Sequence, residues 1–140
     1  MPHLMKSANP HILNLSPPLN MDAKWFKNHV AYTMAKYGMS MCVLGMAEEF
    51  KEHKIGVNAL WPRTAIATAA LNVIGGEMLK SRARSPKIVA DAAYHILKRS
   101  AQECTGNFFI DDEVLRSEGV QDLSGYSDCP EDQLIPDFFI

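Results

Sequence analysis

The chain has 140 residues, of which 47% are hydrophobic and 21% are charged. This balance is typical of one folded domain with a core and excludes an intrinsically disordered chain. No run of eighteen apolar residues occurs, so the sequence predicts no membrane-spanning helix. Residues 1–110 carry thirteen Lys and Arg against seven Asp and Glu, whereas residues 111–140 carry one against nine. The acidic end either neutralises the basic part or is simply solvated, and we favour solvation.

Composition also limits metal and nucleic-acid binding. The cysteines Cys42, Cys104 and Cys129 are odd in number and far apart, and the five histidines form no zinc-binding pair. We therefore expect reduced thiols in an intracellular protein and no metal site. The basic cluster at 80–87 has no interleaved aromatic residues, and the isoelectric point is about 6.2, so we expect no nucleic-acid binding.

The first half of the chain predicts two strands around a long helix. Residues 11–15 form a short apolar run that is stopped by a Ser-Pro-Pro sequence, which favours a buried strand. Residues 17–28 predict a loop. Residues 29–54 are rich in Ala, Met, Leu and Glu and predict a helix. Residues 55–61 predict a second buried strand, which ends at Pro62.

The second half continues the alternation. Residues 63–80 predict a short helix that ends at a pair of glycines. Ser85 and Pro86 predict the start of a helix that runs to Arg99, because a capping hydroxyl precedes a proline. Residues 105–110 predict a third strand, and the acidic remainder is expected to be mostly irregular. The order of elements favours an α/β fold with a parallel sheet of about three strands and helical crossovers.

The strongest chemical pattern is Tyr32-x-x-x-Lys36 on the long predicted helix. Residues four apart share a helix face, so the phenol and the ammonium project together. A nearby positive charge lowers the pKa of a phenol, which can then exchange a proton with a carbonyl or alcohol oxygen. Such a pair also arises by chance on helix surfaces, so its context must decide.

That context resembles the short-chain dehydrogenase/reductase family. A strand runs into Ser16, Tyr32 and Lys36 follow on a long helix, and the segment Val-Asn-Ala-Leu-Trp-Pro ends at Pro62. The segments Thr-Gly-Asn-Phe-Phe-Ile-Asp and Leu-Ile-Pro-Asp-Phe-Phe add to the resemblance, which covers nearly the whole chain. The resemblance implies a partial Rossmann-like, doubly wound parallel sheet and an NAD(P)-dependent oxidoreductase that interconverts carbonyls and alcohols.

The resemblance also implies residue roles. Ser16 would hold the substrate oxygen, Tyr32 would be the general acid in reduction and the general base in oxidation, and Lys36 would lower the pKa of Tyr32. Tyr32 and Lys36 would also contact the nicotinamide ribose. Further cofactor contacts would come from the segment after the second strand, from Pro62, Thr64, Ile66 and Thr68.

Some features depart from the family pattern or have a second interpretation. Arg63 stands where the family usually has Gly, and the expected Thr is shifted to Thr68. Thr64 and Thr68 are also suited to capping the following helix, and Ser16 is also a natural strand stop. Residues 65–85 would form the lid over the substrate.

The family's Gly-rich turn, Thr-Gly-x-x-x-Gly-x-Gly, has no match in the 140 residues. Gly38 and Gly45 fall within the predicted helix, and the glycines at 75–76 follow no strand. Because this turn holds the pyrophosphate of the dinucleotide, we expect residues 1–111 to be the C-terminal half of such a domain, with the N-terminal half missing. Residues 112–140 would be an acidic extension of the same domain.

Two hypotheses of function follow. In the first, the chain is a truncated part of an NAD(P)-dependent oxidoreductase of small lipid-like or steroid-like carbonyls and alcohols, and alone it neither binds NAD or NADP nor turns over. In the second, it is a non-catalytic assembly or interaction module. The family packs this helix against a second copy, which implies a homo-oligomer through residues 29–54. The resemblance implies a peroxisome or mitochondrion, and no targeting signal is visible.

Overall fold

The computed structural model describes the backbone of residues 1–140 and every side chain except those of Asn72, Ile74 and Gly75. The chain divides into two compact units, each assembled from separate stretches of sequence. Unit one consists of Met1–Trp61, Ile96–Phe109 and Phe139, and unit two consists of Pro62–His95, Ile110–Phe138 and Ile140.

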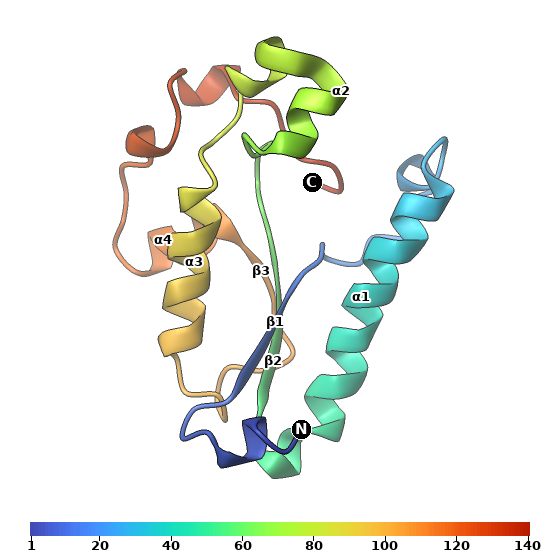
Figure 1. The fold of residues 1–140 in the computed structure, drawn as a ribbon, viewed down its shortest axis with the longest axis vertical. Coiled ribbons are helices and arrows are strands. Elements are labelled where there is room, and N and C mark those ends of the chain that lie inside the picture. Colours follow the sequence, from blue (N-terminus) through green and yellow to red (C-terminus); the bar gives the residue numbers. More distant parts are fainter. The chain divides into compact units, whose positions relative to one another are not determined.

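A three-stranded parallel sheet confirms the predicted α/β fold. Its strands are β1 (His11–Leu15), β2 (Gly56–Trp61) and β3 (Phe108–Ile110), in the order β1-β2-β3 (Figure 1). Ile12 of β1 pairs with Val57 of β2 in parallel register. All residues of β2 are buried, as expected for a central strand with a continuous apolar run.

The long predicted helix is present but shorter than its sequence pattern. Helix α1 spans Val30–Glu49 and packs against β1 and β2 (Figure 1). The prediction extended it to residue 54, but the chain leaves the helix at Phe50 and turns through a 3-10 segment, Lys51–His53. Lys54 then adopts a left-handed backbone with φ 57°, which reverses the chain into β2.

The core of unit one lies between α1 and the sheet. Val43 and Ala47 of α1 pack on Val57 and Ala59 of β2, with Ile55 completing the cluster. This burial removes apolar surface from water and holds α1 against the sheet.

Unit two contains the remaining helices. Helix α2 (Ala69–Lys80) consists of two helical segments joined at a kink, because Gly76 inside it takes a non-helical backbone with φ 60°. The first segment ends at the glycines, as predicted. Helix α3 (Lys87–Lys98) follows the predicted Ser-Pro start. Helix α4 (Asp111–Ser117) was not predicted, and it carries three acidic side chains in its first turn, where the helix dipole favours them. Among the described residues, no helix combines the length and apolar character needed to cross a bilayer.

Candidate functional site

Tyr32 and Lys36 lie on one face of α1, as predicted. Tyr32 is 46% exposed. The Lys36 Nζ donates a hydrogen bond to the backbone carbonyl of Leu15, at 3.1 Å, and lies 5.1 Å from the ring centre of Trp61. The ammonium therefore reaches the carboxyl ends of β1 and β2, where parallel α/β sheets bind their ligands.

Ser16 is the residue directly after the Leu15 carbonyl that Lys36 contacts. It is fully buried, and its Oγ has no hydrogen-bond partner among the described residues. A buried hydroxyl without a partner carries a desolvation cost of about 1–3 kcal/mol, which a substrate oxygen would relieve.

A row of hydroxyl side chains on the buried face of α1 holds the loop that follows Ser16. We call Thr33, Tyr37 and Ser40 the hydroxyl row. Thr33 Oγ1 donates to the carbonyl of Trp25, Tyr37 OH donates to that of Asn20 at 2.5 Å, and Ser40 Oγ donates to that of Pro17 at 2.6 Å.

The spacing of the hydroxyl row explains its geometry. Residues separated by four and then three positions lie on one stripe of a helix, so the three hydroxyls face the loop together. All three side chains are buried. Burial also raises the pKa of the Tyr37 phenol, which keeps it protonated as a donor. The sequence contained this signal as hydroxyl residues at helical spacing, but it did not identify the loop carbonyls as their partners.

Five aromatic rings gather beside the Tyr-Lys pair in unit one. We call them the aromatic cluster: Trp25, Tyr32, Tyr37, Trp61 and Phe139. Phe139 lies at its centre, with ring centroids 5.0 Å from Tyr37, 5.8 Å from Trp25 and 5.9 Å from each of Tyr32 and Trp61. The sequence resemblance did not assign Phe139 to the site.

The proposed cofactor segment lies in unit two. Thr64 is buried, forms an antiparallel bridge with Pro136, and its Oγ1 has no partner among the described residues. Ile66 forms a parallel bridge with Arg84, which fixes the segment after Pro62. Thr68 precedes α2, but its side chain makes no capping hydrogen bond, so capping does not account for it. Ser16, Tyr32 and Lys36 belong to unit one.

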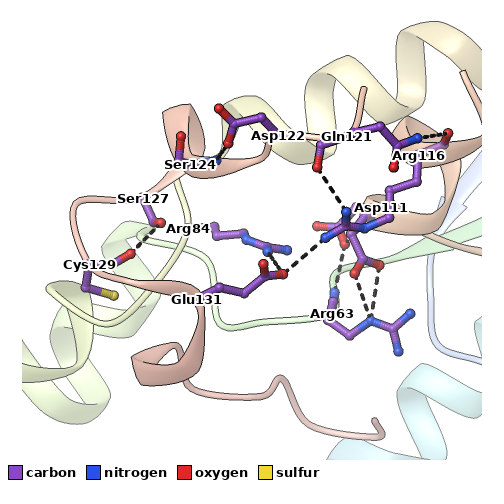
Figure 2. Close-up of polar contacts among 11 residues, drawn as sticks. Arg63, Arg84, Asp111, Arg116, Gln121, Asp122, Ser124, Ser127, Cys129 and Glu131 are labelled. Atoms are coloured by element: carbon purple, nitrogen blue, oxygen red, sulfur yellow. Dashed lines mark hydrogen bonds and ion pairs between the residues drawn. The ribbon is translucent and has the colours of Figure 1, made fainter. Parts of the chain in front are cut away.

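Arg63, which replaces the family's usual Gly, has a structural role. Its backbone N–H donates to Asp111 Oδ1 at 2.9 Å (Figure 2). Its Nε donates to both carboxylate oxygens of Asp112 at 3.1 Å. Its Nη2 also pairs with Glu113. Arg63 therefore anchors the proposed cofactor segment to the first turn of α4. Burial raises the pKa of the Asp111 carboxyl, although the two backbone donors partly oppose this.

A second polar network fixes the acidic part of unit two. Arg84 is only 1% exposed, and its Nη2 pairs with Glu131 Oε1 at 2.9 Å (Figure 2). Arg116 reaches the same carboxylate oxygen at 3.3 Å and also donates to the carbonyl of Gln121. These contacts indicate that the acidic end of the chain is partly neutralised by buried and half-buried arginines, the alternative that we did not favour from composition. No group of three or more His, Cys, Asp and Glu side chains in the described part of the chain could hold a metal ion.

Comparison with known proteins gives close relatives over the full chain. No protein-family model matches. The chain is 58% identical over 140 residues to hydroxysteroid dehydrogenase-like protein 2 of Danio rerio, 57% to that of Xenopus laevis and 54% to that of Homo sapiens. In each comparison all of this chain is matched, but it covers only 33% of the relative. The chain therefore spans about a third of the length of these relatives.

Solved structures agree with these relatives. A putative dehydrogenase from Xanthomonas campestris matches 99% of this chain with a TM-score of 0.92 and 48% identity, over 51% of its own length. A short chain dehydrogenase from Mycobacterium thermoresistibile matches 99% with a TM-score of 0.88 and 44% identity, over 49% of its length. The angucycline C-6 ketoreductase LanV with bound NADP shares the fold, at 21% identity and a TM-score of 0.56 over 72% of this chain and 41% of its own.

The catalytic and cofactor roles of the residues, and the location in a peroxisome or mitochondrion, stay predictions. The predicted fold and the predicted family resemblance, in contrast, are both supported by these comparisons. Along its whole length the chain is similar to hydroxysteroid dehydrogenase-like 2 proteins and to short-chain dehydrogenases with a partial Rossmann-like sheet, which confirms the resemblance predicted from its sequence.

Proposed function

We propose that this chain provides the proton-transfer part of an NAD(P)-dependent oxidoreductase that interconverts a carbonyl and an alcohol. One observation carries the proposal. Lys36, which follows Tyr32 by one helical turn, donates a hydrogen bond from its Nζ to the carbonyl of Leu15. The next residue is Ser16, whose buried hydroxyl has no partner among the described residues. A phenol, an ammonium and a serine hydroxyl thus come from two elements that meet at the carboxyl end of β1.

Each of the three side chains would have one role. The Tyr32 phenol gives its proton to the carbonyl oxygen in reduction and takes it back in oxidation. The Lys36 ammonium favours the phenolate by its charge. The Ser16 hydroxyl donates a hydrogen bond to the same substrate oxygen, which stabilises the negative charge that develops there.

The residues present fit one end of a dinucleotide. Within unit one, Lys36 carries donors suited to ribose hydroxyls, and its Nζ reaches the carboxyl end of β1. When bound, the dinucleotide supplies or accepts the hydride. The Gly-rich turn that cradles a pyrophosphate has no match in the sequence. We therefore propose that the segment works as part of a longer protein, on lipid-like or steroid-like substrates, as the relatives' name suggests.

The test is a chimera in which this chain replaces the corresponding segment of the Danio rerio relative, which is 58% identical. We expect the chimera to reduce steroid or fatty acyl ketones with NADH or NADPH. Tyr32→Phe should lower kcat by roughly 10²–10⁴-fold, the usual contribution of general acid–base catalysis. The matched control is Tyr94→Phe on α3, because Tyr94 is 60% exposed and belongs to unit two. Equal rates for the Tyr32→Phe and unaltered chimeras would contradict the proposal.

A second function, self-association, is favoured by the outer face of α1. Val30, Met34, Met41 and Leu44 are each at least half exposed and fall on one helical stripe. Soluble monomers rarely expose a contiguous apolar stripe of this kind. We propose that a second copy of the chain covers this stripe, so that two α1 helices pack against each other.

A further inference from the structure

Phe139 has an unusual backbone for an aromatic residue. Its φ is 79°, and among the described residues only Asn28 and Lys54 are other non-glycine residues with positive φ. Asn tolerates this left-handed region, whereas a bulky aromatic residue there is strained. Such strain persists only where the surroundings hold the residue firmly, and it concentrates at functional sites.

The surroundings of Phe139 do hold it firmly. Its side chain is 4% exposed, and its ring meets Trp25 at an interplanar angle of 52°, Tyr37 at 38° and Trp61 at 65°. These tilted and edge-on arrangements are favourable for aromatic pairs at such separations. Tyr37 is fixed in turn by its hydrogen bond to the Asn20 carbonyl. Phe139 is therefore held in a cage of rings rather than packed against one surface.

The contact with Tyr32 differs from the other three. The two rings are nearly parallel, with an interplanar angle of 10° and centroids 5.9 Å apart, which is an offset stack. Tyr32 is 46% exposed, and the stack with Phe139 lies on one face of its ring. A flat neighbour on that face restricts rotation about the Cα–Cβ bond of Tyr32, which is the rotation that changes the direction of the phenol.

We propose that Phe139 is a positioning residue for Tyr32, whose stacked ring fixes the direction of the phenol. The strain at Phe139 is balanced by the cage of rings, and the cage directs the flat face of Phe139 at Tyr32. The role of this contact in proton transfer rests on the function proposed above, whereas the ring contact is observed independently of that function. A role in merely filling space would be met equally well by a leucine, whereas a stack needs a flat ring.

The experiment measures how freely the Tyr32 phenol reacts in the full 140-residue chain. The chain is treated briefly with N-acetylimidazole, and acetylation of each tyrosine is quantified by peptide mass spectrometry. Tyr94, which is 60% exposed, provides the reference rate, and Tyr37, which is 2% exposed, reports unfolding. Phe139→Leu should raise the ratio of Tyr32 to Tyr94 acetylation by roughly two- to tenfold, the factor that a stacked aromatic pair is worth.

Three comparisons complete the test. Phe139→Tyr keeps a flat ring and should restore the unaltered ratio. Phe109→Leu removes an aromatic ring whose observed partner is Arg99, also in unit one, and should leave the ratio unchanged. Equal ratios in Phe139→Leu and the unaltered chain, with Tyr37 still protected, would overturn the proposal, and so would equal increases in the Leu and Tyr variants.

A second measurement covers the case in which Phe139→Leu unfolds the chain. In the unaltered chain, nuclear Overhauser contacts between the ring protons of Tyr32 and Phe139 are expected, and their absence would overturn the proposal. Neither measurement needs cofactor or turnover. A failure of the chimera assay would therefore leave the positioning of Tyr32 standing, and a failure here would leave the proton-transfer role of Tyr32 untouched.

Discussion

Removing one hydroxyl from the hydroxyl row should destabilise the fold by a predictable amount. Ser40 is fully buried, and its Oγ donates to the Pro17 carbonyl at 2.6 Å. Ser40→Ala deletes the donor with almost no change in volume, so the cavity contribution is small. The Pro17 carbonyl loses that donor, which costs about 1–3 kcal/mol. Against a typical total of about 5–15 kcal/mol, this is a large fraction.

The assay is urea unfolding of the 140-residue chain, combined with amide hydrogen exchange. The urea concentration at the unfolding midpoint should fall, while the dependence of the unfolding free energy on urea stays the same. Amide hydrogen exchange should accelerate at residues 17–25, because the hydroxyl row holds this loop. Ser81→Ala is the matched control, since the exposed Ser81 Oγ donates to the Met78 carbonyl at 3.0 Å. The control should cost under about 0.5 kcal/mol. Equal losses in the two variants, or no loss at Ser40, would refute the reasoning.

Two further predictions concern charge and association. Burial raises the pKa of Asp111 in the folded chain, so the folded chain holds this proton more tightly than the unfolded chain does. Asp111 therefore lowers the free energy of unfolding as the pH rises from about 4, the unfolded pKa, through the folded pKa. Asp111→Asn keeps an acceptor for the backbone N–H groups of Arg63 and Asp112 and should remove this dependence of the unfolding free energy on pH, measured by denaturation at several pH values. An unchanged dependence on pH would contradict the role given to Asp111. On the outer stripe of α1, Met34→Lys should weaken self-association at least tenfold, as measured by analytical sedimentation. Met78→Lys on α2 should leave self-association unchanged, and equal effects of the two substitutions would contradict the proposal that a second copy covers the stripe.

The parts of the fold that depend on local pattern were predictable. Strands β1 and β2 are apolar runs followed closely by prolines, and α1 contains residues with high helix propensity, so their existence and order followed from the local sequence pattern. The end of α1 was predicted several residues too late, because the chain leaves the helix at Phe50 and continues as a 3-10 segment, which the residue types there do not suggest. Helix α4 was missed because an acidic stretch favours a solvated, irregular segment. In the structure its acidic side chains lie in the first helical turn, where the helix dipole stabilises them, and Asp112 accepts a hydrogen bond from Arg63.

The candidate site divides in the same way. Tyr32 and Lys36 were predictable, because a fixed spacing on one helix needs only helical geometry. The partners of the hydroxyl row depend on the path of the loop after Ser16, which no local pattern specifies. Phe139 stacks on Tyr32 from near the opposite end of the chain, and such a long-range contact leaves no periodic signal in a single sequence.

The proton-transfer role proposed for Tyr32 accompanies hydride transfer between dinucleotide and substrate. Its most direct test supplies the chimera with dinucleotide deuterated at C4 of the nicotinamide and a ketone substrate. We expect an alcohol that carries deuterium on the former carbonyl carbon, and we expect Tyr32→Phe to reduce its formation by roughly 10²-fold or more. An alcohol without deuterium, or a Tyr32→Phe chimera that forms the deuterated alcohol at the unaltered rate, would contradict the proposal.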